Sequence, residues 1–133
     1  MSNRQTIQDV YAAFGRGDVP AILSVLDENI EWEYGMMDSG VPWFRKRKGR
    51  SEVAGFFEAL GGVEFINFQP KTVLEGENLI VVLIDLTFKV KSTGKTVTEE
   101  DEIHIWHFDD KGAVTRFCHK CDTYQHWRAT QSE

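Results

Sequence analysis

The stretch LIVVLIDLTFKV, from Leu79 to Val90, decides the fold class. Its odd-numbered positions include the polar residues Asp85, Thr87 and Lys89, whereas its even-numbered positions are all apolar. Successive side chains of a strand point to opposite faces, so this alternation predicts a long strand with one buried face. The face expected to lie against helices consists of Ile80, Val82, Ile84, Leu86, Phe88 and Val90.

The segments around this strand carry the same kind of pattern. NIEWEY alternates between apolar and acidic residues, which is typical of a half-buried strand. The turn signals EGEN, STGK and DDKG divide the second half of the chain into antiparallel strands. Strands are therefore expected at residues 29–34, 64–75, 78–91, 95–109 and 113–124.

Helices are expected in the first half of the chain. Apolar residues recur at i, i+3, i+4 and i+7 in the first segment, after the capping candidates Ser2 and Asn3. A second helix is expected after Asp18 with Pro20 in its first turn, and a third over Val53 to Leu60. Helices followed by antiparallel strands predict one α+β domain over residues 1–133, with three helices packed on a strongly curved, mainly antiparallel sheet.

The composition excludes several classes of partner. The chain has 133 residues and a formal net charge of -6, so nucleic acid and anionic membranes are not expected to bind it. The beginning of the sequence lacks the apolar segment of a signal peptide, and no apolar run is long enough to cross a bilayer. A cytoplasmic protein is therefore expected. No phosphate loop, metal cluster or dinucleotide fingerprint is evident, so no cofactor and no metal are expected.

The motif FCHKCDTY, residues 117–124, places Cys118 and Cys121 three positions apart. This spacing suits a redox pair or half of a zinc site only if both sulfurs can approach each other. On the expected strand the two cysteines point to opposite faces, so neither site is expected. His119 between them is expected to face the interior together with Phe117.

The order of these segments resembles a known family. GRGD between two helices, ENIEWEY, the helix GRSEVAGFF and the strand pair IHIWHFDDKGAVTRF are together similar to the SnoaL-like branch of the nuclear transport factor 2-like superfamily, which includes relatives of ketosteroid isomerase. The resemblance implies a cystatin-like, cone-shaped α+β barrel around an apolar cavity, commonly dimeric. Its members include isomerases, polyketide cyclases, hydrolases and small-molecule binders, and the fold alone does not select among them.

The catalytic residues of ketosteroid isomerase do not carry over to this sequence. That enzyme uses a carboxylate base and an oxyanion hole made by a tyrosine and a protonated aspartate. The tyrosine position falls on Val10, one residue before Tyr11, and the base position falls on Tyr34. The aspartate position falls on His104. Steroid isomerisation by that mechanism is therefore not expected.

His104 is the first candidate for chemistry because it titrates near neutral pH and shares a face with Trp106 and Phe108. It is proposed as a general base or hydrogen-bond donor, with the Tyr34 hydroxyl as its partner. Glu102 lies two residues away on the same face and could orient the imidazole. The alternatives remain open: His104 as a structural histidine, and Glu102 as a solvated acid of the hairpin.

His119 is expected on a neighbouring strand, where it either pairs with His104 or has a structural role. His107 and His126 are expected on the outer face and in the terminal segment, as surface or interface residues. Several aromatic residues are expected to line the pocket and contact the ligand, and the alternative for them is core packing. The residues expected to contact a hydrophobic, polycyclic or carbonyl-bearing ligand are Phe14, Trp32, Phe57, Phe88, Glu102, Trp106, Phe117 and His119.

Two surface features suggest other partners. WFRKRKGR, residues 43–50, gathers basic residues in a loop that either attracts an anionic ligand group or is merely solvated. Both faces of the strands keep apolar character, which predicts a homodimer through the sheet. The alternative function is a non-catalytic interaction module that binds a protein with this outer face.

Overall fold

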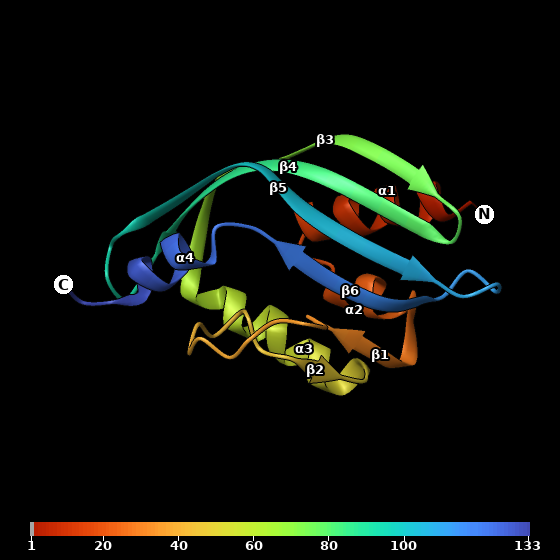
Figure 1. Ribbon diagram of the computed structural model, residues 1–133, viewed down its shortest axis with the longest axis horizontal. Coiled ribbons are helices and arrows are strands. Elements are labelled where there is room, and N and C mark those ends of the chain that lie inside the picture. The colour runs from red at the N-terminus through yellow and green to blue at the C-terminus, as the bar shows by residue number, and fades with distance from the viewer. Residues whose placement is uncertain (1) are drawn as a thin grey trace.

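The computed structural model describes residues 2–133, and over this range helices pack on one curved sheet (Figure 1). The α-helices are α1 (Asn3–Gly15), α2 (Val19–Leu23), α3 (Arg50–Ala59) and α4 (Thr123–Thr130), and η1 (Leu60–Gly62) is a 3-10 turn. The strands are β1 (Leu26–Trp32), β2 (Arg47–Lys48), β3 (Val63–Gly76), β4 (Leu79–Val90), β5 (Thr96–Phe108) and β6 (Val114–Lys120). The α+β prediction is confirmed, although residues 2–133 contain four α-helices instead of the three that were expected.

The sheet is mainly antiparallel, with the order β2-β1-β6-β5-β4-β3. Its parallel pair joins β1 to β6, so a strand from the beginning of the chain lies beside one from its end. Figure 1 shows β3, β4 and β5 arching over α1, while α4 lies at one end of the sheet near the C-terminus. None of the helices within residues 2–133 combines the length and the apolar character needed to span a bilayer.

The central strand β4 has the alternation that the sequence predicts. All six even-numbered residues from Ile80 to Val90 are buried, and the neighbouring odd-numbered residues are half-buried or exposed. The even face packs in one core with Ile7 and Val10 of α1, Ile22 of α2 and Val53 of α3. Apolar burial of this kind contributes about 25 cal/mol per Å², so the strand parity determines which side of the sheet the helices cover.

Side-chain caps fix where three of the helices begin. The Ser2 hydroxyl accepts a hydrogen bond from the Gln5 amide at 3.0 Å, and the Asp18 carboxylate accepts one from the Ala21 amide at 3.2 Å. Asp122 caps α4 in the same way, 3.1 Å from the Gln125 amide. These caps satisfy amides that have no partner within their own helix.

Helix α4 corrects the expectation of a strand over residues 113–124. Strand β6 ends at Lys120, and the chain turns into α4 directly after the cap Asp122. His126 and Ala129, three positions apart, form the buried side of this helix. An Asp followed three positions later by Gln is close to a capping-box pattern, which was the available signal for a helix start.

A bulge in β5 places two acidic side chains in the interior. Asp101 has a positive φ of 61°, and the pairing with β4 shifts between Glu99 and Glu102. The extra residue reverses the alternation, as β-bulges do, so Glu99 and Glu102 are both buried while Glu100 is exposed. Regular alternation would instead have turned Glu100 inward with Glu102. The alternative in which Glu102 is a solvated acid of the hairpin is wrong, because Glu102 is 3% exposed.

The end of β1 departs from the expected alternation in a similar way. The strand stops at Trp32, and Glu33 has a φ of 60°. Glu33 is therefore fully buried, whereas Tyr34 turns to the outer side of the sheet. The prediction that Tyr34 shares a face with Trp32 is wrong because one left-handed residue separates them.

Candidate functional site

An aromatic-lined pocket lies between the sheet and the helices, with a volume of about 70 Å³. Every residue expected at the site except Tyr34 lies in its wall. Tyr11, Trp43, Phe44 and His126 also lie there, and the sequence analysis assigned none of them to the site. The expected residues that line the pocket are Phe14, Trp32, Phe57, Phe88, Glu102, His104, Trp106, Phe117 and His119.

Tyr34 lies outside this pocket. Its hydroxyl is 2.6 Å from Nε2 of His107, and the guanidinium of Arg116 stacks 3.8 Å from the centre of its ring. His107 and Arg116 are on the outer side of the sheet, where His107 was expected. Tyr34 therefore cannot be the hydrogen-bond partner of His104.

Tyr11 occupies the place at His104 that was assigned to Tyr34. Its hydroxyl lies 2.7 Å from Nδ1 of His104 and accepts the indole N–H of Trp106 at 3.1 Å. Since an indole only donates, the Tyr11 hydrogen is free to point at Nδ1. The other ring nitrogen, Nε2, then carries a hydrogen and donates it to Oε2 of Glu102 at 2.7 Å.

This chain of hydrogen bonds shifts the acidity of its members in different directions. Burial, together with the nearby His119, lowers the pKa of His104 and keeps it neutral. Burial opposes ionisation of Glu102, but the hydrogen bond from His104 and the surrounding imidazoles lower its pKa overall. Burial raises the pKa of Tyr11 well above 10, so its hydroxyl stays protonated.

His119 faces the same pocket and is held by Glu33. The two oxygens of Glu33 accept the backbone amide of His119 at 2.8 Å and its Nδ1–H at 2.6 Å. Although burial opposes protonation of His119, the charge and hydrogen bond of Glu33 raise its pKa. Simple alternation places Glu33 on the outer face of β1, so the sequence pattern alone does not indicate that it holds His119.

The two histidines form an unequal pair. Their ring centres are 4.5 Å apart, and each ring is nearly perpendicular to the other. A positive charge on His119 disfavours a second charge on His104 at this distance. The pocket therefore holds a neutral imidazole beside one that readily becomes positive.

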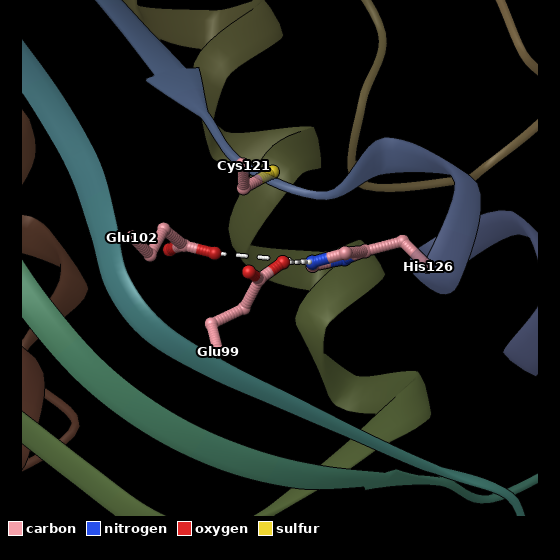
Figure 2. A group of neighbouring side chains, drawn as sticks. All are labelled: Glu99, Glu102, Cys121 and His126. Carbon is pink, nitrogen blue, oxygen red and sulfur yellow. Dashed lines mark hydrogen bonds and ion pairs between the residues drawn. The ribbon is translucent and has the colours of Figure 1, made fainter.

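A second group of polar side chains lies between β5 and α4 (Figure 2), and two of its members, Glu102 and His126, line the pocket. Glu99 and Glu102 extend from β5 toward His126 of α4, with Cys121 on the adjoining segment. Nε2 of His126 is 2.8 Å from Oε2 of Glu99, and its Nδ1 is 3.0 Å from the indole nitrogen of Trp43. His126 is only 2% exposed and lies in the pocket wall, so the expectation of a surface or interface position in the terminal segment is wrong.

The cysteines of FCHKCDTY lie on opposite faces, as predicted, and both are free thiols. Cys118 is buried beside Tyr34 on the outer side. The Cys121 sulfur is within 4.8 Å of ligand-type atoms of Glu99, Glu102 and His126. The motif is therefore neither a redox pair nor a joint metal site.

The loop WFRKRKGR contributes its aromatic residues rather than its charges. Trp43 and Phe44 are buried in the pocket wall, whereas none of the basic residues from Arg45 to Arg50 lies there. The interpretation in which this loop draws an anionic group into the pocket therefore gains no support from its geometry.

Two sets of side chains have the composition of a metal site. Ligand-type atoms lie within 4.8 Å of one another in Glu99, Glu102, Cys121 and His126, and again in Glu102, His104 and His119. An imidazole binds a metal through a nitrogen that carries no hydrogen. In His104 and His126 the nitrogen that faces a glutamate donates its hydrogen to it, so in this hydrogen-bond pattern these two nitrogens are not free to bind a metal.

Comparison with known proteins places this architecture in a family. Residues 7–117 match the family described as SnoaL-like domain. The chain belongs to this family. The family resemblance inferred from the order of the motifs is thus confirmed, and the matched residues run from α1 to β6.

Solved structures show the same fold over nearly the full chain. An NTF2-like protein of Burkholderia xenovorans LB400 is 28% identical, with a TM-score of 0.83, and the match covers 97% of this chain and 95% of that one. An NTF2-like protein of unknown function from Burkholderia pseudomallei K96243 is 26% identical, with a TM-score of 0.81 and coverages of 97% and 98%.

TerC, crystallised with polyporic acid, is similar in fold to this SnoaL-like chain, at 24% identity, a TM-score of 0.76 and coverage of 96% of each chain. No curated protein sequence shows significant similarity to the chain.

Proposed function

We propose that this SnoaL-like chain binds a small hydrophobic ligand in its aromatic pocket and moves a proton on that ligand through His104, without a cofactor. Isomerisation, cyclisation and hydrolysis are the reaction types that such proton transfer serves. The observation that carries the proposal is the buried chain Tyr11–His104–Glu102 in a wall that is otherwise mainly apolar. General acid–base catalysis of this kind contributes about 10²–10⁴-fold to a rate.

The hydrogen bonds indicate how His104 acts as the base. A ligand hydrogen passes to the Tyr11 oxygen while the Tyr11 hydrogen passes to Nδ1 of His104. The imidazolium formed is stabilised by the Glu102 carboxylate at Nε2. Returning the hydrogen to another ligand atom by the reverse steps completes an isomerisation. The lowered pKa of His104 supports this role because the imidazole starts out neutral.

His119 supplies the complementary donor. Its Nδ1 is held by Glu33, which leaves Nε2 as the ring nitrogen available to a ligand. A positive imidazole stabilises negative charge that develops on a carbonyl oxygen as a proton is removed. The pair of histidines thus supports a base and an electrophile within one pocket.

The size of the pocket limits the ligand. A volume of about 70 Å³ corresponds to roughly five to seven water molecules at 10–15 Å³ each. This space suits a ligand with one ring, so we expect a smaller body than the polycyclic one suggested by the family resemblance. Half-buried aromatic side chains at the surface end of the pocket provide its entrance, namely Phe14, Phe57, Phe65 and Phe68.

We expect acetophenone and related one-ring ketones to raise the melting temperature, because a ligand that binds only the folded state stabilises it by mass action. A compound from this screen that is also converted should lose about 10²-fold or more of its turnover in His104→Ala. His107→Ala is the matched control, since that histidine lies on the outer side of the sheet. Unchanged turnover in His104→Ala would remove His104 from the mechanism.

We further propose a homodimer through the outer face of the sheet. Val81, Leu83, Ile103 and Ile105 are half-buried apolar residues on this face, which the helices leave uncovered. The same patch supports the alternative function, in which the chain is a non-catalytic interaction module.

Light scattering at micromolar concentration should give twice the 15.3 kDa mass of one chain. Val81→Asp combined with Ile105→Asp should give a monomer, because two buried charges would face each other in the interface. Lys89→Asp, which alters an exposed residue at the end of the same strand, should remain dimeric. A monomeric unaltered protein would refute the interface.

A further inference from the structure

At the α4 end of the pocket two glutamates lie together, and the ion-pair partners found for them are histidines rather than lysine or arginine. Glu99 and Glu102 are 8% and 3% exposed, and the β5 bulge turns both of them inward. Their oxygens lie within 4.8 Å of each other and of His126 (Figure 2). Two like charges at this separation repel each other strongly in an apolar surrounding.

The hydrogen bonds of the two carboxylates are unequal. Oε2 of Glu99 accepts the Asp122 amide at 3.1 Å and Nε2–H of His126 at 2.8 Å. Oε2 of Glu102 accepts from His104, but its Oε1 is buried and has no hydrogen-bond partner among the described residues. Leaving such an acceptor unpaired costs about 1–3 kcal/mol, and more when it is charged.

His126 does not neutralise this pair. Trp43 can only donate its indole hydrogen, so Nδ1 of His126 must accept it and cannot itself carry a hydrogen. A single hydrogen therefore remains for Nε2, which donates it to Glu99. This assignment of the neutral form follows from the donors present. His126 lies 3.8 Å from Oε1 of Glu102, too far for a hydrogen bond.

The other side chains near the two glutamates are compatible with a positively charged group. Burial and the nearby carboxylates raise the pKa of Cys121, so its thiol stays protonated and adds no charge. Trp43, Phe44 and Phe88 enclose His126, and the rings of Phe44 and Phe88 lie 4.7 and 5.4 Å from its ring. Aromatic faces attract cations by about 0.5–2 kcal/mol.

We propose that the ligand of this pocket carries a protonated amine, which donates a hydrogen bond to Oε1 of Glu102, the carboxylate of this pair that lines the pocket. The inference rests on the proposed function, since it assumes a one-ring ligand in the same pocket. The amine supplies the missing donor and the missing positive charge, and its hydrocarbon body contacts the aromatic wall. Tyr11 and His104 then face another part of the same ligand.

A set of probes with one body and different head groups tests the inference on the unaltered protein. Benzylamine, benzyl alcohol and benzoate share one ring and differ in charge. We expect benzylamine to bind at least about tenfold more tightly than benzyl alcohol, a difference of about 1.4 kcal/mol, and benzoate to bind most weakly. Ligand-observed NMR and thermal shift at pH 7 measure this order.

Glu102→Gln keeps the shape of the side chain and removes its charge. We expect this variant to bind benzylamine about tenfold more weakly than the unaltered protein does, while its affinity for benzyl alcohol stays within about threefold of the unaltered value. Glu100→Gln is the matched control, since Glu100 is exposed on the same strand. If Glu102→Gln does not fold, the order of the three probes on the unaltered protein still decides.

The possible outcomes separate this inference from the function on which it rests. Equal affinity for all three probes would refute the proposed amine group. It would indicate that the two glutamates share a proton, and it would leave the proposed hydrophobic pocket intact. If neither these three probes nor acetophenone bind, both the amine inference and the proposed ligand-binding function are refuted. A response to zinc chloride that Cys121→Ser removes, without a response to benzylamine, would assign the cluster to a metal and overturn the amine.

Discussion

Glu33→Ala is expected to lower the free energy of unfolding by about 3–5 kcal/mol, the usual effect of removing one partner from a buried charged pair. Glu33 is fully buried, and both of its oxygens accept hydrogen bonds from His119. Without Glu33, the backbone amide and the ring N–H of His119 lose their acceptor. Their position is buried, so water does not take the place of the carboxylate. Urea unfolding followed by circular dichroism measures the difference.

Glu31→Ala is the control for this prediction. Glu31 precedes Glu33 by two residues, but its carboxylate is about half exposed and pairs with Arg116 on the surface at 3.1 Å. Exposed pairs of this kind contribute about 0–1 kcal/mol. Similar losses in the two variants would contradict the buried role of Glu33.

The effect of Glu33→Ala should depend on pH. Because Glu33 raises the pKa of His119 in the folded protein, this stabilisation is fully present below the unfolded pKa of about 6.5 and is lost as the pH rises through the folded pKa. The variant should therefore be most destabilised near pH 6 and less so near pH 9. NMR titration should show the pKa of His119 falling in the variant.

His104 should behave in the opposite way. Its pKa is lowered in the folded protein, so its contribution is present above about pH 6.5 and is lost as the pH falls through the folded pKa. The same NMR titration should place His104 below the ordinary histidine value and His119 above it. The reverse order would mean that the positive charge resides on the other ring.

Phe117→Ala is the second change with a large expected effect, a loss of about 3–5 kcal/mol. The Phe117 ring is 1% exposed, stacks on Trp32 at 4.1 Å between ring centres and packs at a tilt against Trp106 at 4.4 Å. Truncation removes these contacts and leaves a cavity that rigid neighbours on two strands cannot close. Urea unfolding again gives the measurement.

Two comparisons identify the cause of this loss. Phe117→Leu should cost clearly less, since it keeps most of the buried volume. Ile66→Ala, on β3, should be within about 0.5 kcal/mol of the unaltered protein because Ile66 is 62% exposed. An equal loss in Phe117→Leu and Phe117→Ala would indicate that the ring stacking, and not the volume, stabilises the core.

Regular alternation made much of the fold and of the pocket predictable. The parity of β4 identified the buried side of the sheet, and the same parity on β5 and β6 placed His104, Trp106, Phe117 and His119 at one pocket. These residues follow from local backbone geometry, because a regular strand needs no information from distant segments to assign its faces.

The residues that parity missed lie where the backbone is irregular or where a contact is distant in sequence. Positive φ values at Glu33 and Asp101 reverse the alternation, which hid the buried positions of Glu33 and Glu99. Trp43 and Tyr11 reach their histidines from segments more than 80 residues away, at 3.0 and 2.7 Å. No short window of sequence contains such a contact, so the polar residues of the site can be identified only from the folded structure.

The pairing of β1 with β6 has a consequence for how the chain acquires its structure. Trp32 of β1 lies opposite Phe117 of β6, so the two strands meet only after almost the whole chain is available. Pairings between distant segments form slowly, since a long loop must close first. During synthesis the Trp32 side chain of β1 would emerge well before its partner Phe117. We therefore expect the nascent chain to depend on chaperones until its last strand has left the ribosome.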